Sequence, residues 1–107
     1  MKWVEIITLR SPANNSLEFL DALSGQISDS DTPKNLMALK IYHHSVVETD
    51  LSIHIHWESE EDSPRKSPLG LRFVSALKSL GLLNHSVWAE TTARKINQRP
   101  ACNADMK

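Results

Sequence analysis

Apolar and polar residues alternate in two different periods along the chain, and the order of these periods predicts the fold. Residues 3–10 (WVEIITLR) and 85–92 (HSVWAETT) are rich in β-branched and aromatic side chains, which is typical of strands. Residues 36–47 and 51–57 predict two further strands, and the polar turn at 48–50 joins them into an antiparallel hairpin. Within 51–57 the alternation is strict, with Leu51, Ile53, Ile55 and Trp57 on one face and Ser52, His54, His56 and then Glu58 on the other.

Two other segments follow the helical period. Leu17, Leu20, Leu23 and Ile27 recur at helical spacing and predict an amphipathic helix, with Phe19 at the edge of its apolar stripe and Asn14 or Asn15 as its cap. A second helix is expected to begin at Ser67-Pro68, a capping hydroxyl followed by proline in the first turn. Its apolar stripe contains Leu69, Phe73, Leu77 and Leu80, and Gly81 is expected to close it in a left-handed conformation.

The element order predicts a ferredoxin-like α+β domain (βαββαβ) over residues 1–92. Two right-handed crossovers interleaved in this way give a four-stranded antiparallel sheet with both helices on one face. The first and third strands would then be central and the second and fourth would be edges. Residues 93–107 are polar and without pattern, which predicts a flexible tail.

The face of the sheet turned away from the helices is the expected place of function. The third strand gives it His54, His56 and Glu58. The first strand is expected to add Trp3, Glu5 and Ile7, leaving Val4 and Ile6 toward the helices, and the last strand to add Ser86, Trp88 and Glu90. The opposite phase of the first or last strand would exchange some of these residues. Because this face mixes aromatic and ionisable side chains, we expect a second subunit or a ligand to cover it.

Composition narrows the classes of partner. A chain of 107 residues fits one domain, and its net charge of −1 disfavours nucleic acid and anionic membranes as partners. No stretch approaches the roughly 20 apolar residues of a membrane span, and the first residues lack the long apolar run of a secretory signal. The single cysteine, Cys102, excludes an intrachain disulfide. A cytoplasmic location is therefore expected.

The element order, the length and the semi-polar open sheet face over residues 1–92 resemble the dimeric α+β barrel superfamily. That group includes antibiotic-biosynthesis-monooxygenase-like and stress-responsive barrel proteins. The resemblance implies a homodimer whose two sheets pack face to face, with a small molecule or haem bound between the sheet and the helices. Some members are cofactor-free oxygenases and others have no known activity. No diagnostic motif is present, so the resemblance assigns no catalytic residue.

Histidines form the only concentration of reactive side chains, because His43, His44, His54 and His56 share the predicted hairpin. In one interpretation His54 or His56 is the general base of a catalytic cleft. The ligand-binding residues of this cleft would be Trp3, Glu5, Tyr42, Trp88 and Glu90.

In a second interpretation the same strand binds a divalent metal. An H-x-H strand projects both imidazoles to one face about 7 Å apart, so His54, His56 and Glu58 could ligate zinc, iron or manganese, with Glu5 nearby. The alternative is that these are interface histidines hydrogen-bonded to carboxylates.

The sequence therefore predicts a small-molecule-binding homodimer of the barrel type, and the resemblance implies an oxygenase or isomerase that requires no cofactor. Two alternatives stay open: a non-catalytic structural or regulatory dimerisation module, and a metal-binding protein that uses the His54/His56 strand. An RNA-binding sheet is not expected, because the residues beyond His54 and His56 are acidic. The substrate and the identity of any metal are not specified.

Overall fold

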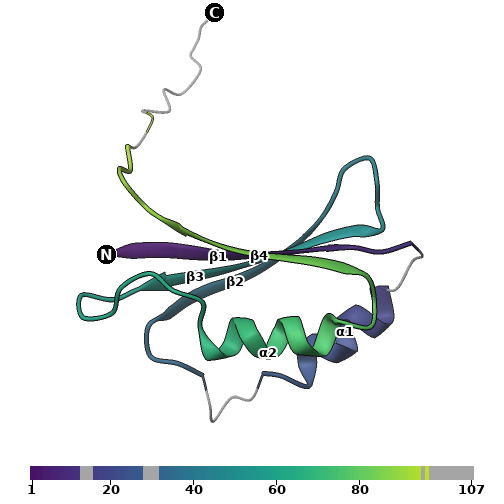
Figure 1. Cartoon of the computed structure of the whole chain (residues 1–107). Helices are drawn as coiled ribbons and strands as arrows, with labels where there is room; N and C mark the ends of the chain where they lie inside the picture. The colour runs from purple at the N-terminus through teal and green to yellow at the C-terminus, as the bar shows by residue number, and fades with distance from the viewer. Residues whose placement is uncertain (13–15, 28–31, 95, 97–107) are drawn as a thin grey trace, which may run out of the picture.

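The six predicted elements are present in the computed structural model, which describes residues 1–12, 16–27, 32–94 and 96. They are β1 (Lys2–Arg10), α1 (Ser16–Ser24), β2 (Leu36–His43), β3 (Asp50–Glu58), α2 (Pro68–Leu77) and β4 (Leu82–Ala89). The strands form one four-stranded sheet in the order β2-β3-β1-β4, and all neighbouring pairs are antiparallel. Figure 1 shows both helices on the same side of the sheet. The predicted ferredoxin-like fold, with β1 and β3 at the centre, is confirmed.

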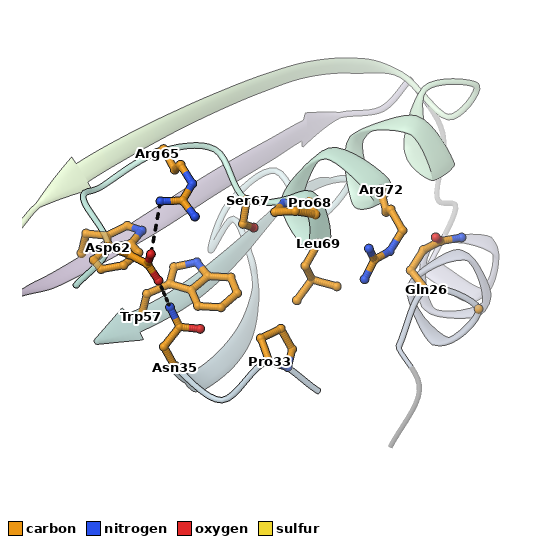
Figure 2. Close-up of a pocket in the computed structure, with 12 residues that line it drawn as sticks. Gln26, Pro33, Asn35, Trp57, Asp62, Arg65, Ser67, Pro68, Leu69 and Arg72 are labelled. Atoms are coloured by element: carbon orange, nitrogen blue, oxygen red, sulfur yellow. Dashed lines mark hydrogen bonds and ion pairs between the residues drawn. The ribbon is translucent and has the colours of Figure 1, made fainter. Parts of the chain in front are cut away.

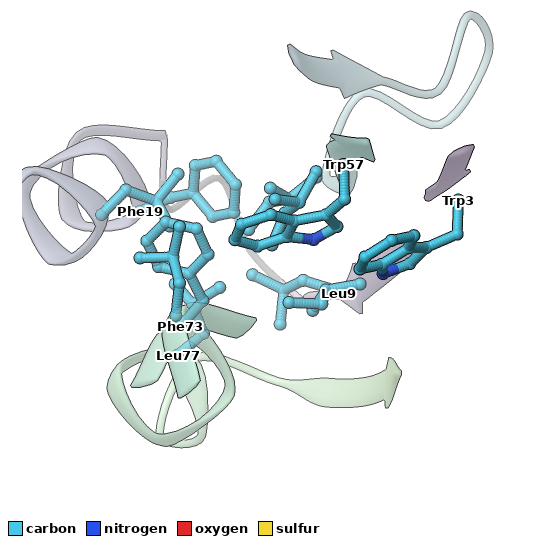
Figure 3. Close-up of a cluster of buried hydrophobic side chains, with 11 residues drawn as sticks. Trp3, Leu9, Phe19, Trp57, Phe73 and Leu77 are labelled. Atoms are coloured by element: carbon cyan, nitrogen blue, oxygen red, sulfur yellow. The ribbon is translucent and has the colours of Figure 1, made fainter. Parts of the chain in front are cut away.

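The core lies between the sheet and the helices, and it corrects the predicted phase of β1. Trp3 pairs with Trp57 and Glu5 with Ile55, so Trp3, Glu5, Ile7 and Leu9 all face the helices and are buried. Val4 and Ile6 lie on the other face, opposite the prediction. Figure 3 shows the apolar part of this core, which contains Trp3, Ile7, Leu9, Phe19, Leu23, Ile53, Ile55, Trp57, Leu69, Phe73 and Leu77.

Helix α1 presents a different stripe from the one predicted. Phe19 and Leu23, one turn apart, are buried, whereas Leu20 and Ile27 are exposed. Ile27 lies beyond the end of the helix at Ser24. The predicted caps Asn14 and Asn15 lie outside the described residues. The bulky Phe19 ring therefore takes the core position that the leucine spacing had assigned to Leu20.

Helix α2 begins as predicted but ends differently. Ser67 is the N-cap, and its side chain accepts a hydrogen bond of 2.9 Å from the Gly70 backbone N–H. The C-cap is Lys78, and Gly81 does not have a positive φ. Glycine is required at 81 for another reason, because a Cβ there would overlap the carbonyl oxygen of Arg10.

Within the part of the chain that the structure describes, no helix has the length and apolar composition needed to cross a bilayer. Of the predicted tail, residues 95 and 97–107, including Cys102, lie outside the described residues.

Candidate functional site

A fully buried carboxylate lies at the start of α2. Glu5 is 0% exposed and receives hydrogen bonds from three side chains and one backbone N–H. The Trp57 indole N–H donates to Oε2 at 2.7 Å, and the Ser67 hydroxyl donates to the same oxygen. The Ser67 backbone N–H lies 2.9 Å from Oε1, and His85 Nε2 lies 2.8 Å from it. We call Glu5, Trp57, Ser67 and His85 the Glu5 network.

The donors of the Glu5 network fit an ionised carboxylate. An indole N–H and a backbone N–H can only donate, and they address the two different oxygens of Glu5. The Ser67 hydroxyl already accepts from Gly70 N–H, so its own hydrogen is free to point at Oε2. The N-terminus of α2 also favours negative charge at this point. Burial of this charge is therefore offset by hydrogen bonds and by the helix.

Gly70 lets helix α2 approach this carboxylate closely. A Cβ at position 70 would overlap Glu5 Oε1 and would lie 3.1 Å from the His85 ring carbon Cε1. Any larger residue would therefore push α2 away from β1 or displace the carboxylate.

A cavity of about 590 Å³ opens beside the network, and we call it the sheet–helix cavity. Its apolar wall contains Leu69 and the indoles of Trp3 and Trp57, whose ring centroids lie 6.3 Å apart at an interplanar angle of 20°. Figure 2 shows Trp57, Ser67 and Leu69 around this space, together with side chains from the loop before β2 and the loop before α2. Trp57 and Ser67 belong both to the cavity wall and to the Glu5 network, so the two features are directly connected.

The rim of the sheet–helix cavity is polar. Asp62 accepts a hydrogen bond of 3.2 Å from the Asn35 amide and lies 3.7 Å from the Arg65 guanidinium, as the dashed lines in Figure 2 indicate. The Ser59 hydroxyl accepts from the backbone N–H of Asp62 at 3.0 Å, which holds this loop. Arg72 extends from α2 toward the same space. The rim therefore combines amide groups, one carboxylate and two guanidinium groups.

Two indole N–H groups in this wall differ in their partners. Trp57 Nε1 donates to Glu5, whereas Trp3 Nε1 is buried and has no hydrogen-bond partner among the described residues. A buried donor without an acceptor is unfavourable. The stacked pair thus contains one satisfied and one unsatisfied donor in the same local environment.

His54 and His56 lie on the face of the sheet turned away from the core, which we call the open face. Both described helices lie on the other side of the sheet (Figure 1). His54 Nε2 lies 2.8 Å from the Ser52 hydroxyl, and the Tyr42 ring packs beside His54 at 4.6 Å between centroids. The pKa of His54 is lowered, first by burial and then by the charges of His56 and Lys40. His56 Nε2 is buried without a hydrogen-bond partner in the described part of the chain.

The predicted site residues divide between the two faces. Tyr42, Trp88, His54 and His56 lie on the open face as predicted, but they line two separate hollows. His54 and Tyr42 line a hollow of about 600 Å³, whereas His56, Trp88 and Glu90 line one of about 540 Å³. Trp3 and Glu5 are on the helix side, and this corrects their expected place beside the histidines.

The histidines do not form the expected metal set. The His54 and His56 rings lie 6.4 Å apart, close to the spacing expected for an H-x-H strand. Among the residues described, however, no group of three histidine, cysteine, aspartate or glutamate side chains is placed to hold a metal ion. Glu5 is separated from them by the sheet. His44 instead organises the β2–β3 loop, where its Nδ1 accepts from Val46 N–H and Val47 N–H at 3.0 Å each.

The resemblance implied a small-molecule site between the sheet and the helices, but the residues that line the sheet–helix cavity and those of the Glu5 network were not identified from the sequence. One signal was available, because Glu5 stands in the run WVEII of a predicted central strand, where a charge on the buried phase requires partners. Ser67 was identified as a helix cap, but nothing local indicated that its hydroxyl would also reach Glu5.

Comparison with known proteins shows similarity of fold alone. No protein-family model and no curated protein matches the chain. Among solved structures, Rv0793 from Mycobacterium tuberculosis is similar with a TM-score of 0.64 at 13% identity, covering 89% of this chain and 100% of that one. The cofactor-independent oxygenase SnoaB from Streptomyces nogalater has a TM-score of 0.64 at 9% identity, covering 86% and 95%. A protein from Deinococcus radiodurans, provisionally assigned as an antibiotic biosynthesis monooxygenase, has a TM-score of 0.64 at 14% identity, covering 90% and 99%. The chain thus has the fold of the antibiotic-biosynthesis-monooxygenase-like dimeric α+β barrel proteins.

Proposed function

We propose that the chain binds a small organic molecule in the sheet–helix cavity and acts on it as a cofactor-free oxygenase or isomerase. The observation that carries the proposal is the cavity itself, with its indole wall, its polar rim and a buried carboxylate directly behind it. Pockets of this size and composition are typical of small-molecule sites. The fold supports the proposal, since SnoaB shares it and is a cofactor-independent oxygenase.

The chemistry that both reactions share is removal of a proton from a carbon next to a carbonyl group. Ser67 lines the cavity and donates its hydroxyl hydrogen to Glu5. One lone pair of this hydroxyl accepts from Gly70 N–H, and the second is left for a ligand. A ligand proton can pass to the Ser67 oxygen while the Ser67 hydrogen passes to Glu5 Oε2. In this mechanism Glu5 is the general base and Ser67 relays the proton.

The histidines of the open face are the alternative base. His54 has a lowered pKa, which keeps its imidazole neutral and able to accept a proton near neutral pH. Its hollow, however, is lined by strand and loop residues on the open face, so a second subunit would be needed to enclose a ligand there.

Deuterium exchange at carbon distinguishes these two bases. β-Tetralone, an enolisable aromatic ketone, is incubated with the protein in D₂O, and incorporation beside its carbonyl is followed by NMR. We expect exchange faster than in buffer, lost in Ser67→Ala and retained in Ser67→Thr, which keeps the hydroxyl. The double variant His54→Gln/His56→Gln serves as the matched control and should retain exchange. If exchange persists in Ser67→Ala and disappears in the histidine variant, the base is on the open face. If a bound ketone exchanges no faster than in buffer, the proposed chemistry is wrong.

We also propose that the open face pairs with a second copy of the chain. Trp88 in β4 is 60% exposed and Tyr42 in β2 is 46% exposed on this face. Both described helices lie on the other side of the sheet (Figure 1). Large aromatic side chains exposed on an uncovered sheet favour an interface. Sedimentation velocity of the Trp88→Arg variant tests this, with Leu71→Arg on the exposed side of α2 as control. We expect a dimer for wild type and the control and a monomer for Trp88→Arg. A monomeric wild-type protein would contradict the proposed dimer.

A further inference from the structure

On the rim of the sheet–helix cavity, the described residues carry more positive than negative charge. Three charged side chains line the cavity: Asp62, Arg65 and Arg72. Asp62 is already engaged by Arg65 and by the Asn35 amide. Arg72 has no carboxylate within ion-pair distance among the described residues. Within the described part of the lining, the guanidinium of Arg72 therefore has no carboxylate partner.

The carboxylate behind the cavity does not supply the missing charge. Both oxygens of Glu5 are occupied by Trp57, Ser67 and His85, and the side chain is fully buried. Arg72 is thus left to whatever enters the cavity from solvent.

From this arrangement we propose that the sheet–helix cavity selects planar aromatic anions, a ligand class that rests on the proposed small-molecule site. The ring system would lie against Leu69 and the Trp3–Trp57 wall, and the anionic group would meet Arg72. Figure 2 shows the Arg72 side chain directed from α2 toward the cavity, on the Leu69 side of the rim. A planar guanidinium forms two parallel hydrogen bonds with carboxylate-like groups, so it fixes orientation as well as charge. The enolate that proton removal would form is itself an anion of this class.

A neutral ligand of the same shape is disfavoured for a physical reason. Arg72 is exposed in the free protein, and a ligand that packs against its guanidinium excludes part of the surrounding water; a charge that loses water without gaining a partner is unfavourable. An anionic ligand replaces that water with an ion pair. The preference should therefore appear as a difference between two ligands that differ only in charge.

Two naphthalene probes provide this comparison. Anilinonaphthalene sulfonate and N-phenylnaphthylamine share one ring system, and only the first carries a sulfonate. Their affinities for the full-length protein are measured by fluorescence titration. We expect the sulfonate to bind about tenfold tighter, as one hydrogen-bonded charge pair implies. In Arg72→Gln this preference should be lost because the sulfonate binds more weakly. The affinity of the neutral probe for this variant should stay within about twofold of its affinity for wild type, which is the scatter of such comparisons. Lys78→Gln, at the other end of α2 and outside the cavity lining, should leave both affinities unchanged.

The outcomes separate this inference from the proposed function. Equal binding of the two probes, or a sulfonate preference that survives Arg72→Gln, overturns the anion selectivity and leaves the cavity as a binding site. Failure of both probes to bind, together with no exchange of β-tetralone, overturns the proposed function itself. Loss of sulfonate binding in Arg72→Gln with Lys78→Gln unaffected supports the inference.

Discussion

The stacked tryptophans allow the energetic role of the Glu5 network to be measured by a matched pair of substitutions. Trp3 and Trp57 are both buried, lie side by side on β1 and β3 and contact the same cavity (Figure 3). Replacing either one by phenylalanine removes a similar part of the ring. Only Trp57→Phe also removes a donor to the buried carboxylate, which accepts its hydrogen bond at 2.7 Å.

The expected difference follows from these hydrogen bonds. A hydrogen bond to a charged group contributes about 1.5–3 kcal/mol to stability, and this is lost in Trp57→Phe. Trp3→Phe removes a buried N–H that has no partner among the described residues, and this offsets part of its lost packing. We therefore expect Trp57→Phe to be more destabilising than Trp3→Phe by about 2–4 kcal/mol.

Urea unfolding followed by far-ultraviolet circular dichroism measures both variants, because most of this signal comes from the backbone, unlike tryptophan fluorescence. A change in midpoint at unchanged m value would report stability alone. A double-mutant cycle with Glu5→Gln provides the control, since Trp57→Phe should couple to it and Trp3→Phe should not. Equal destabilisation by the two variants, or absence of coupling between Trp57 and Glu5, would refute the proposed role of the network.

Further predictions concern the same network and the open face. Glu5→Gln should destabilise by about 1–3 kcal/mol in thermal unfolding, because a carboxamide has only one acceptor oxygen and must leave a buried N–H unpaired; an unchanged melting temperature would contradict this. Gly70→Ala should cost about 1–3 kcal/mol through overlap with Glu5, whereas Gly25→Ala, whose Cβ would meet nothing closer than 3.6 Å, should be neutral or slightly stabilising in the same assay. The pKa of His54, followed by NMR titration, should lie below its ordinary value of 6.5 and should rise in Lys40→Met. Because the pKa of His54 is lower in the folded state, the unfolded chain binds this proton more readily, and the free energy of unfolding should increase with pH between the lowered pKa and 6.5. His54→Gln should reduce this slope. An unchanged slope would contradict a lowered pKa of His54 in the folded protein.

The fold could be predicted from sequence because β3 and α2 are locally unambiguous. Alternation in residues 51–57 places every apolar side chain on one face, and the structure confirms that Ile53, Ile55 and Trp57 are buried. The Ser67-Pro68 start of α2 is equally clear, since the capping bond and the proline both act within one turn. Element order and the rules of connection then leave few topologies.

The phase of β1 could not be predicted because its decisive interactions are distant in sequence. Residues 3–10 carry apolar side chains on both faces, so the charge of Glu5 appeared to mark the exposed one. In the structure its partners are 52, 62 and 80 residues away. No local pattern records that a tryptophan, a helix cap and a histidine will converge on one carboxylate. The polarity of Glu5 predicted an exposed side chain, but hydrogen bonds to distant residues allow it to be buried.

The candidate site likewise depends on residues that are distant from one another in the sequence. The histidines of the open face were visible because they lie on one hairpin, but the sheet–helix cavity is lined by β1, β3, the α1–β2 loop, the β3–α2 loop and α2. Each segment contributes one or a few side chains, and none forms a motif by itself. A site assembled in this way becomes recognisable only when the register between β1 and β3 is known.

The sheet–helix cavity has a fixed wall and a polar rim, and these two parts can contribute differently to ligand selection. Ser67 caps α2 through Gly70 N–H and is bound to Glu5 through both its hydroxyl and its backbone, so the start of the helix is held from two directions. Trp57 is held by the same carboxylate, and the back of the cavity therefore has a defined shape. Arg65 and Arg72 are exposed and long, and their charged ends can adjust to a bound group. Shape is consequently fixed where the ring of a ligand would rest, and charge is adaptable where its polar group would be recognised.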